Sequence, residues 1–195
     1  MFHPLFIPVY ATLFYFFITR NYFYDHEIYL IFVQVVILTV LLPLCIFYLL
    51  RSLGLISSRM ILNNNERRIP LACQAILLFI LIKYSLSASV LPELYYYFTG
   101  CLVSTLLCLL LVLFRHKASL HMLGVTTLTL FVISISVYYH IQILYLIAFF
   151  VLCIGFTASS RLQAKAHGIS EIILGVLAGA VPQVLLWYLW LVPAV

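Results

Sequence analysis

The sequence predicts an all-α fold, a polytopic bundle of about six or seven membrane-spanning helices. Of the residues, 66% are hydrophobic and only 8% are charged, and the mean hydropathy is +1.22. A soluble domain of 195 residues cannot bury that much apolar surface, so a lipid bilayer has to cover it. The apolar residues form continuous runs without dyad alternation, which excludes a transmembrane β-barrel. We therefore expect one integral membrane domain over residues 1–195, without a linker.

Seven apolar runs give the expected spans, because a helix needs roughly 20 residues to cross the hydrocarbon core. The first run is short and contains Pro8, whereas Pro70 stands where a proline can begin the third helix. Lys83 lies far enough along that span to extend its ammonium to the interface. The three tyrosines at 95–97 are typical of an interfacial aromatic belt. The expected spans are residues 4–19, 28–50, 71–90, a fourth that ends near 114, then 123–139, 141–158 and 172–191.

The charged residues and the cysteines exclude several function classes. The formal charge is +5, but the basic residues are scattered among spans, which argues against nucleic-acid binding. The five cysteines lie in or beside apolar runs without metal-ligand spacing, so we expect neither disulfides nor a metal site. The first residues lack the basic region of a signal peptide, and the first apolar run is therefore expected to remain in the protein.

Alternation of the spans places the loops after the second, fourth and sixth spans on one side of the membrane. We call the polar segments of these loops the three polar islands, residues 66–68, 115–121 and 160–171. The positive-inside rule explains why lysines and arginines gather in such loops, but not the histidines, the serine and the carboxylate beside them. Eight of the ten Lys and Arg residues lie on this side, namely Arg51, Arg59, Arg67, Arg68, Arg115, Lys117, Arg161 and Lys165.

The third polar island carries residue types that suit phosphoryl chemistry. Arg161 precedes His167 by six residues, and Glu171 follows His167 by four. If a helix begins near His167, the imidazole and the carboxylate share one face, about one turn apart. A carboxylate in that position fixes the tautomer of the imidazole, and an arginine offers a planar charged fork for phosphate. The alternative is that these are ordinary polar residues of a membrane loop.

The three islands resemble the signatures of the type-2 phosphatidic acid phosphatase superfamily, which includes lipid phosphatases, glucose-6-phosphatase and vanadium haloperoxidases. In the third signature, Ser160-Arg161, five residues, His167, three residues and Glu171 keep the family spacing, with Glu in place of Asp. In the second, Ala118-Ser119-Leu120-His121 keeps the serine and histidine but not the proline and glycine. In the first, Arg68-Ile69-Pro70 remains, and Arg59 is the candidate substitute for the missing lysine. The resemblance covers about residues 59–179. The chain also resembles a short bacterial branch of this superfamily in which the second signature is similarly altered.

The resemblance implies a two-step hydrolysis without a metal or other cofactor. His167 would attack phosphorus and form a phosphohistidine, with Glu171 orienting the ring. His121 would protonate the leaving oxygen and then activate water. The groups that would hold the phosphate oxygens are Arg68, Lys117, Ser119 and Arg161.

The remaining histidines and two glycines are expected to have other roles. His26, His116 and His140 are interpreted as interfacial residues. His3 lies on the side of the polar islands without an assigned role. Gly175 and Gly179, four residues apart, predict a small-residue seam along which the last helix packs closely.

Two functions of different classes follow from these observations. The first is an integral membrane phosphatase acting on a phospholipid or polyprenyl phosphate or pyrophosphate, with membrane lipids as its surroundings. The second is a catalytically silent relative that serves as a subunit or lipid-binding component of a larger assembly of membrane proteins. A transmembrane haem protein is disfavoured because the histidines lie mainly at span ends. The expected location is a bacterial inner membrane. The positive-inside rule predicts that the side with the polar islands faces the cytoplasm, whereas the family resemblance implies that it faces the periplasm.

Overall fold

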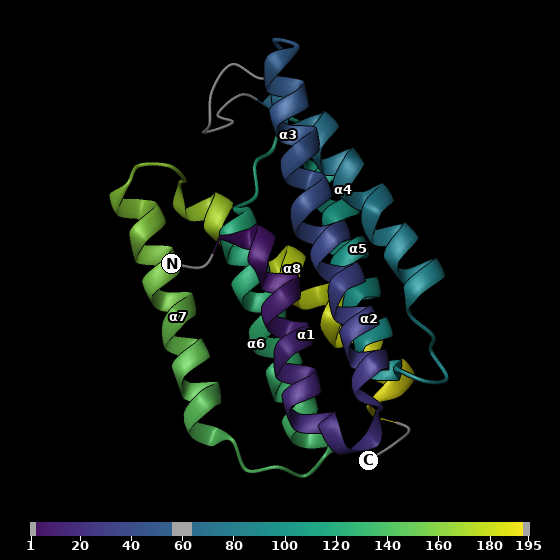
Figure 1. The fold of residues 1–195 in the computed structure, drawn as a ribbon. Coiled ribbons are helices and arrows are strands. Elements are labelled where there is room, and N and C mark those ends of the chain that lie inside the picture. The colour runs from purple at the N-terminus through teal and green to yellow at the C-terminus, as the bar shows by residue number, and fades with distance from the viewer. Residues whose placement is uncertain (1–2, 56–63, 193–195) are drawn as a thin grey trace.

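The computed structural model describes residues 3–55 and 64–192, and the regular structure in these two stretches is helical throughout (Figure 1). Two 3-10 helices, Pro4–Phe6 and Arg20–Tyr22, flank the first α-helix, and a π-helical turn, Ile37–Leu41, joins α2 to α3. The α-helices are α1 (Ile7–Thr19), α2 (Asp25–Val36), α3 (Leu42–Ser52), α4 (Asn64–Ser85), α5 (Pro92–Leu113), α6 (Leu120–Tyr138), α7 (Leu144–Gln163) and α8 (Ile169–Trp190).

The predicted fold class is confirmed, since six helices in the described chain are long and apolar enough to cross a membrane. The segment Pro4–Thr19 forms a shorter apolar helix, so the count of six or seven spans holds. These helices make the chain an integral membrane protein. The six long helices are Asp25–Ser52, Glu66–Ser85, Pro92–Leu113, Leu120–Tyr138, Leu144–Gln163 and Ile169–Trp190.

The expected start of the third span is wrong. Helix α4 begins at Asn64, so Pro70 lies inside the helix and not in its first turn. A proline lacks only the one N–H bond to the carbonyl four residues back, and its ring restricts the residue before it. The polar residues of the first island therefore belong to the helix and not to a loop. Arg67 and Arg68 consequently extend from the first two turns of α4.

The interpretation of residues 95–97 as an aromatic belt fails for Tyr97. The side chain of Tyr97 is only 1% exposed, and its ring centroid lies 4.5 Å from that of Phe131 on α6. Its backbone oxygen accepts a hydrogen bond of 3.0 Å from the side-chain amide of Gln183 on α8. Tyr95 and Tyr96 remain half-buried. Composition cannot separate a lipid-facing tyrosine from a buried one, because both environments are apolar.

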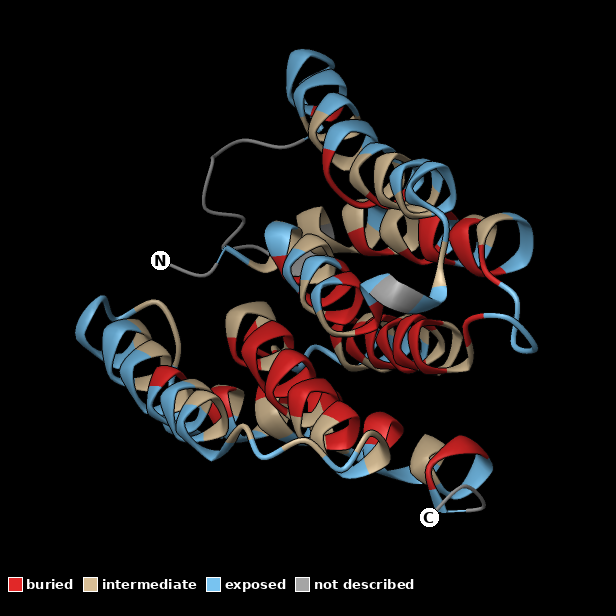
Figure 2. Cartoon of the chain, turned by 60° about the horizontal axis from the view of Figure 1, so that its bottom comes forward, coloured by how far each residue is buried: buried red, intermediate tan, exposed pale blue. Residues whose placement is uncertain are grey.

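Helix α6 occupies the centre of the bundle and packs against α1, α5, α7 and α8. Within its most apolar window 61% of the residues are buried, against 6% for α7. Figure 2 shows buried residues concentrated in the central helices, while α7 at the left is mainly exposed or half-buried. Helices α4 and α5 pack against each other on the other side of the bundle. Because α6 packs against four other helices, the residues of its first turn are held in a fixed position relative to those helices.

The predicted alternation places several helix ends together at the upper end of the molecule in Figure 1. The end of α3, the start of α4, and the connections α5–α6 and α7–α8 lie toward this end, and the N-terminal segment lies lower, beside the start of α6. The three polar islands therefore share one side, as expected from the alternation of spans.

Arg115, His140 and Lys165 have φ values of 64°, 53° and 49°, and each follows the end of a helix. Such left-handed residues end a helix sharply and permit a short connection.

A buried carboxylate joins three elements at the opposite end of the bundle. Glu93, in the first turn of α5, is 2% exposed. The hydroxyl of Tyr15 on α1 donates to it at 3.0 Å, and the hydroxyl of Tyr139 after α6 donates at 2.7 Å. Buried carboxylates need such donors because desolvation is otherwise costly. The sequence around Glu93 gives no local signal of this contact, because its two partners lie 78 and 46 residues away along the chain.

Candidate active site

The second and third polar islands meet where α6 and α8 begin and α7 ends. Ser119 and His121 come from the start of α6, Arg161 from the last turn of α7, and His167 and Glu171 from the start of α8. Helices α6 and α8 pack closely along their length, which brings the two N-terminal ends together. The site is thus formed where α6 and α8 begin and α7 ends.

His167 and Glu171 form the strongest polar contact of the site. The Nδ1 atom of His167 lies 2.6 Å from Oε2 of Glu171, and their side chains are 9% and 26% exposed. Helix α8 begins at Ile169 with Gly168 as its N-cap, so His167 lies just before the helix and not within it. The predicted contact nevertheless forms, because the extended Gly168 turns the imidazole over the first turn. With Nδ1 held by the carboxylate, Nε2 is the nitrogen left for chemistry.

Ser119 is held by its backbone and leaves its hydroxyl available. Its N–H donates to the carbonyl oxygen of Glu171 at 3.0 Å, which ties the α5–α6 connection to α8. Ser119 is the N-cap residue of α6, yet its side chain makes no capping bond. The residue is 0% exposed, and its Oγ has no hydrogen-bond partner among the described residues. A buried hydroxyl without a partner costs free energy unless a ligand supplies one.

Two arginines also have a buried side-chain nitrogen without a described hydrogen-bond partner. Nε of Arg68 and Nε of Arg161 are both buried, and neither has a hydrogen-bond partner within residues 3–55 and 64–192. We call these two nitrogens and Ser119 Oγ the open polar atoms. Arginine nitrogens bind phosphate oxygens in a planar, forked geometry. An anion with several acceptor oxygens would satisfy atoms of this kind.

Arg161, His167 and His3 all lie near enough to His121 to act on it electrostatically. Arg161 carries a positive charge that acts on His121, and His3 and His167 lie close enough to act on it when they are protonated. The imidazole rings of His3 and His121 lie edge to face, with centroids 5.7 Å apart and an interplanar angle of 79°. His3 therefore belongs to the site. Its position in the sequence, ahead of the first span, gives no signal of this contact.

The first polar island approaches the site through Arg67, which is not among the predicted site residues. The charges of Arg67 and Glu171 act on each other, and Cys108 on α5 also lies in the field of Arg67. For Arg68, the predicted phosphate-binding residue, the buried Nε makes no hydrogen bond to any other described residue of the site. Lys117 is half-buried in the α5–α6 connection, without an ion pair to any described residue. Arg59, the candidate substitute in the first signature, lies outside the described residues.

The predicted small-residue seam of α8 lies directly beneath the site. A Cβ atom on Gly175 would lie 2.5 Å from the carbonyl oxygen of Ser119, and one on Gly179 would lie 2.8 Å from that of Leu123. Both distances are too short for real atoms, so only glycine permits this approach. The seam sets the distance between α6 and α8, and with it the position of Ser119 against Glu171.

Gly175→Ala is expected to destabilise the fold and to displace Ser119. The added methyl group collides with backbone, which cannot rotate away, and overpacking of this kind costs about 1–3 kcal/mol. Thermal unfolding in detergent, followed by circular dichroism, should show a lower midpoint. Gly155→Ala on α7 is the matched control, because nothing lies within 4 Å of its added Cβ. Equal midpoints for the two variants would show that α6 and α8 do not depend on this contact.

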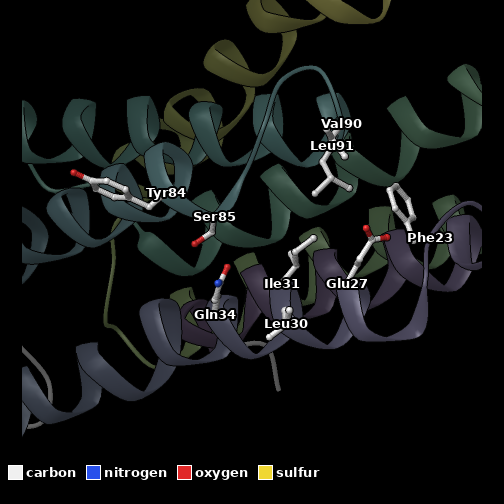
Figure 3. A pocket seen from close by; sticks show the side chains of 9 residues that line it. All are labelled: Phe23, Glu27, Leu30, Ile31, Gln34, Tyr84, Ser85, Val90 and Leu91. Atoms are coloured by element: carbon white, nitrogen blue, oxygen red, sulfur yellow. The ribbon is translucent and has the colours of Figure 1, made fainter.

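A separate pocket lies at the other end of the bundle and contains no predicted site residue (Figure 3). Its volume is about 260 Å³, and α2, the end of α4 and the segment before α5 line it. Gln34 on α2 and Ser85 at the end of α4 point toward one another across it in Figure 3. Its lining is mainly apolar, with Glu27 as its only acid.

Comparison with known proteins adds no assignment: no family model matches the chain, and neither does any curated protein or solved structure.

Proposed function

We propose that this protein is an integral membrane phosphatase that hydrolyses a lipid phosphate or pyrophosphate through a phosphohistidine on His167. One observation carries the proposal: the His167–Glu171 contact of 2.6 Å lies next to Ser119, whose N–H donates to the carbonyl oxygen of Glu171 and whose hydroxyl has no partner among the described residues. Arg161, whose charge acts on His121, has a buried Nε that also lacks a described partner. A phosphoryl group has the oxygens to accept from both. The spacing of these residues resembles the type-2 phosphatidic acid phosphatases, which supports the same reaction class.

In the first step, the lone pair of His167 Nε2 forms a bond to phosphorus while the bond from phosphorus to the leaving oxygen breaks. The electron pair of that bond goes to the leaving oxygen, which takes a proton from the His121 imidazolium. Glu171 accepts the Nδ1 proton of His167 in a hydrogen bond and stabilises the positive ring. Arg161 and Ser119 donate to the equatorial oxygens, with Arg68 and Lys117 as the further predicted donors.

In the second step, neutral His121 removes a proton from water, and the water oxygen attacks phosphorus. The bond from phosphorus to Nε2 breaks and its electron pair returns to His167, so that phosphate leaves and both histidines are restored. Two departures from the family signatures bear on the rate. Leu120 stands in place of the glycine before His121, and Glu171 carries one methylene more than aspartate.

The place of the site in the bundle supports a lipid substrate. Its residues stand at helix ends next to apolar helix surfaces, so a head group can reach them while its chain stays in the bilayer. A phosphatidyl or polyprenyl phosphate has this shape. We place the protein in a bacterial inner membrane with the site facing the periplasm, on the family resemblance.

Release of inorganic phosphate tests the proposal. Purified protein in detergent micelles is incubated with phosphatidic acid, phosphatidylglycerol phosphate, a polyprenyl phosphate and a polyprenyl pyrophosphate. We expect hydrolysis of at least one of them by the wild type. Failure on every substrate, with the protein folded, would overturn the phosphatase function and leave the silent subunit of a membrane assembly in its place.

Glu171→Gln is expected to slow hydrolysis on the order of 10²-fold without unfolding the protein. A neutral amide stabilises an imidazolium poorly, and its NH₂ group selects the wrong tautomer of His167. Glu171→Asp should retain more activity, because it keeps the charge. Rapid-quench trapping of phosphorylated protein measures the effect on the first step. Acid-stable phosphate that maps to Glu171 would contradict the assignment of His167 as nucleophile.

A further inference from the structure

The imidazole of His3 lies against that of His121 in a defined geometry. The two ring centroids are 5.7 Å apart at an angle of 79°, which is an edge-to-face contact. Aromatic pairs prefer this arrangement because the positive edge of one ring faces the negative surface of the other. The charge of Arg161 also acts on His3. His3 is thus in contact with a catalytic group of the proposed reaction.

The backbone around His3 is itself anchored. The Nδ1 atom of His3 accepts a hydrogen bond of 3.4 Å from the N–H of Leu5 and caps the helix Pro4–Phe6. That helix continues into α1, and both pack against α6. A Cβ on Gly124 of α6 would lie 3.0 Å from the side chain of Ile7 and 3.7 Å from Pro4, so the approach is close. The position of His3 is therefore set by the packing of α1 on α6.

The state of His3 suits a packing role beside a histidine that gains and loses protons. Burial lowers the pKa of His3, and the positive charge of Arg161 lowers it further. A neutral His3 adds no repulsion when His121 carries its proton. Its Nδ1 is committed to Leu5. In the neutral ring Nε2 then carries the proton, and the contact that the structure shows with His121 is the edge-to-face contact of the two rings.

We propose that His3 is a positioning residue, whose ring holds the imidazole of His121 in the orientation required for proton transfer to and from the substrate. The role of His3 in proton transfer rests on the proposed function, whereas the ring contact between His3 and His121 is observed independently of it. It assigns the N-terminal segment to the site, although that segment lies outside the three polar islands.

Two substitutions separate ring packing from helix capping. His3→Phe keeps an aromatic ring but loses the acceptor for Leu5, whereas His3→Asn keeps a capping acceptor but loses the ring. We expect His3→Phe to keep kcat within about threefold of the wild type and His3→Asn to lower it about tenfold, with KM little changed in both. His140→Asn, at the other end of α6, is the control and should have no effect.

The second readout needs no activity. In protein labelled with 13C at the histidine rings, relaxation of the Cε1–Hε1 pair of His121, assigned with His121→Gln, reports how rigidly the ring is held. We expect the ring to become more mobile in His3→Asn and to stay ordered in His3→Phe. An unchanged His121 signal in His3→Asn would overturn the proposal. The proposal would also be overturned if His3→Asn kept kcat and the ordered His121 ring while His3→Phe lost them. If the wild type hydrolyses no lipid phosphate, the proposed function fails and the relaxation result alone decides the role of His3.

Discussion

His167→Ala is expected to abolish phosphate release, with a loss of at least about 10³-fold in kcat. In the proposed reaction the Nε2 atom forms the covalent bond to phosphorus, and alanine has no atom to replace it. Water would then have to attack directly, without the splitting of one difficult step into two. The imidazole is the group that Glu171 holds at 2.6 Å, so the carboxylate would also lose its partner. Phosphate release by purified variant and wild type, in the same detergent and lipid, measures the loss.

The control for this variant is His116→Ala, because His116 is an exposed histidine of the second island. It should retain wild-type activity, and both variants should unfold at similar temperatures. Rapid-quench experiments should trap acid-labile phosphate on the wild type and none on His167→Ala. Equal rates for His167→Ala and the wild type would mean that the measured phosphatase is a contaminant. Phosphate trapped on the variant would place the nucleophile elsewhere.

Arg161→Lys is expected to lower kcat by about 10²-fold, although it keeps the positive charge. The Nε atom of Arg161 is buried and has no hydrogen-bond partner in the described part of the chain. Lysine carries no donor at that point of the side chain and cannot form a planar bidentate contact with a phosphoryl group. The loss should therefore exceed what the charge alone explains. Steady-state kinetics on the best substrate, at saturating concentration, measures it.

Arg51→Lys is the matched control, since Arg51 is exposed at the end of α3 on the same side of the membrane. It should leave the rate unchanged. A second control, Arg161→Ala, should be at least as slow as Arg161→Lys. If lysine restores full activity where alanine does not, Arg161 acts through its charge alone and the forked contact with phosphate is wrong.

The membrane-spanning helices were predictable because the signal for them is local. Continuous apolar runs of sufficient length can satisfy their backbone only as helices in a bilayer, whatever they later pack against. Alternation of the runs then placed the three polar islands on one side. The four-residue step from His167 to Glu171 brought the two side chains together, even though the helix begins only after His167. The seam of Gly175 and Gly179 was visible for the same local reason.

Contacts between residues distant in sequence were decided by the tertiary structure. His3 meets His121 across more than one hundred residues, and Glu93 meets Tyr15 and Tyr139 on two other elements. Tyr97 turned inward to α6 and α8, where composition favoured the interface. Lipid and protein interior are equally apolar, so hydropathy shows that a helix lies in the membrane but not which of its faces meets another helix. Only the packing of the helices selects those faces, and with them the neighbours of each polar side chain.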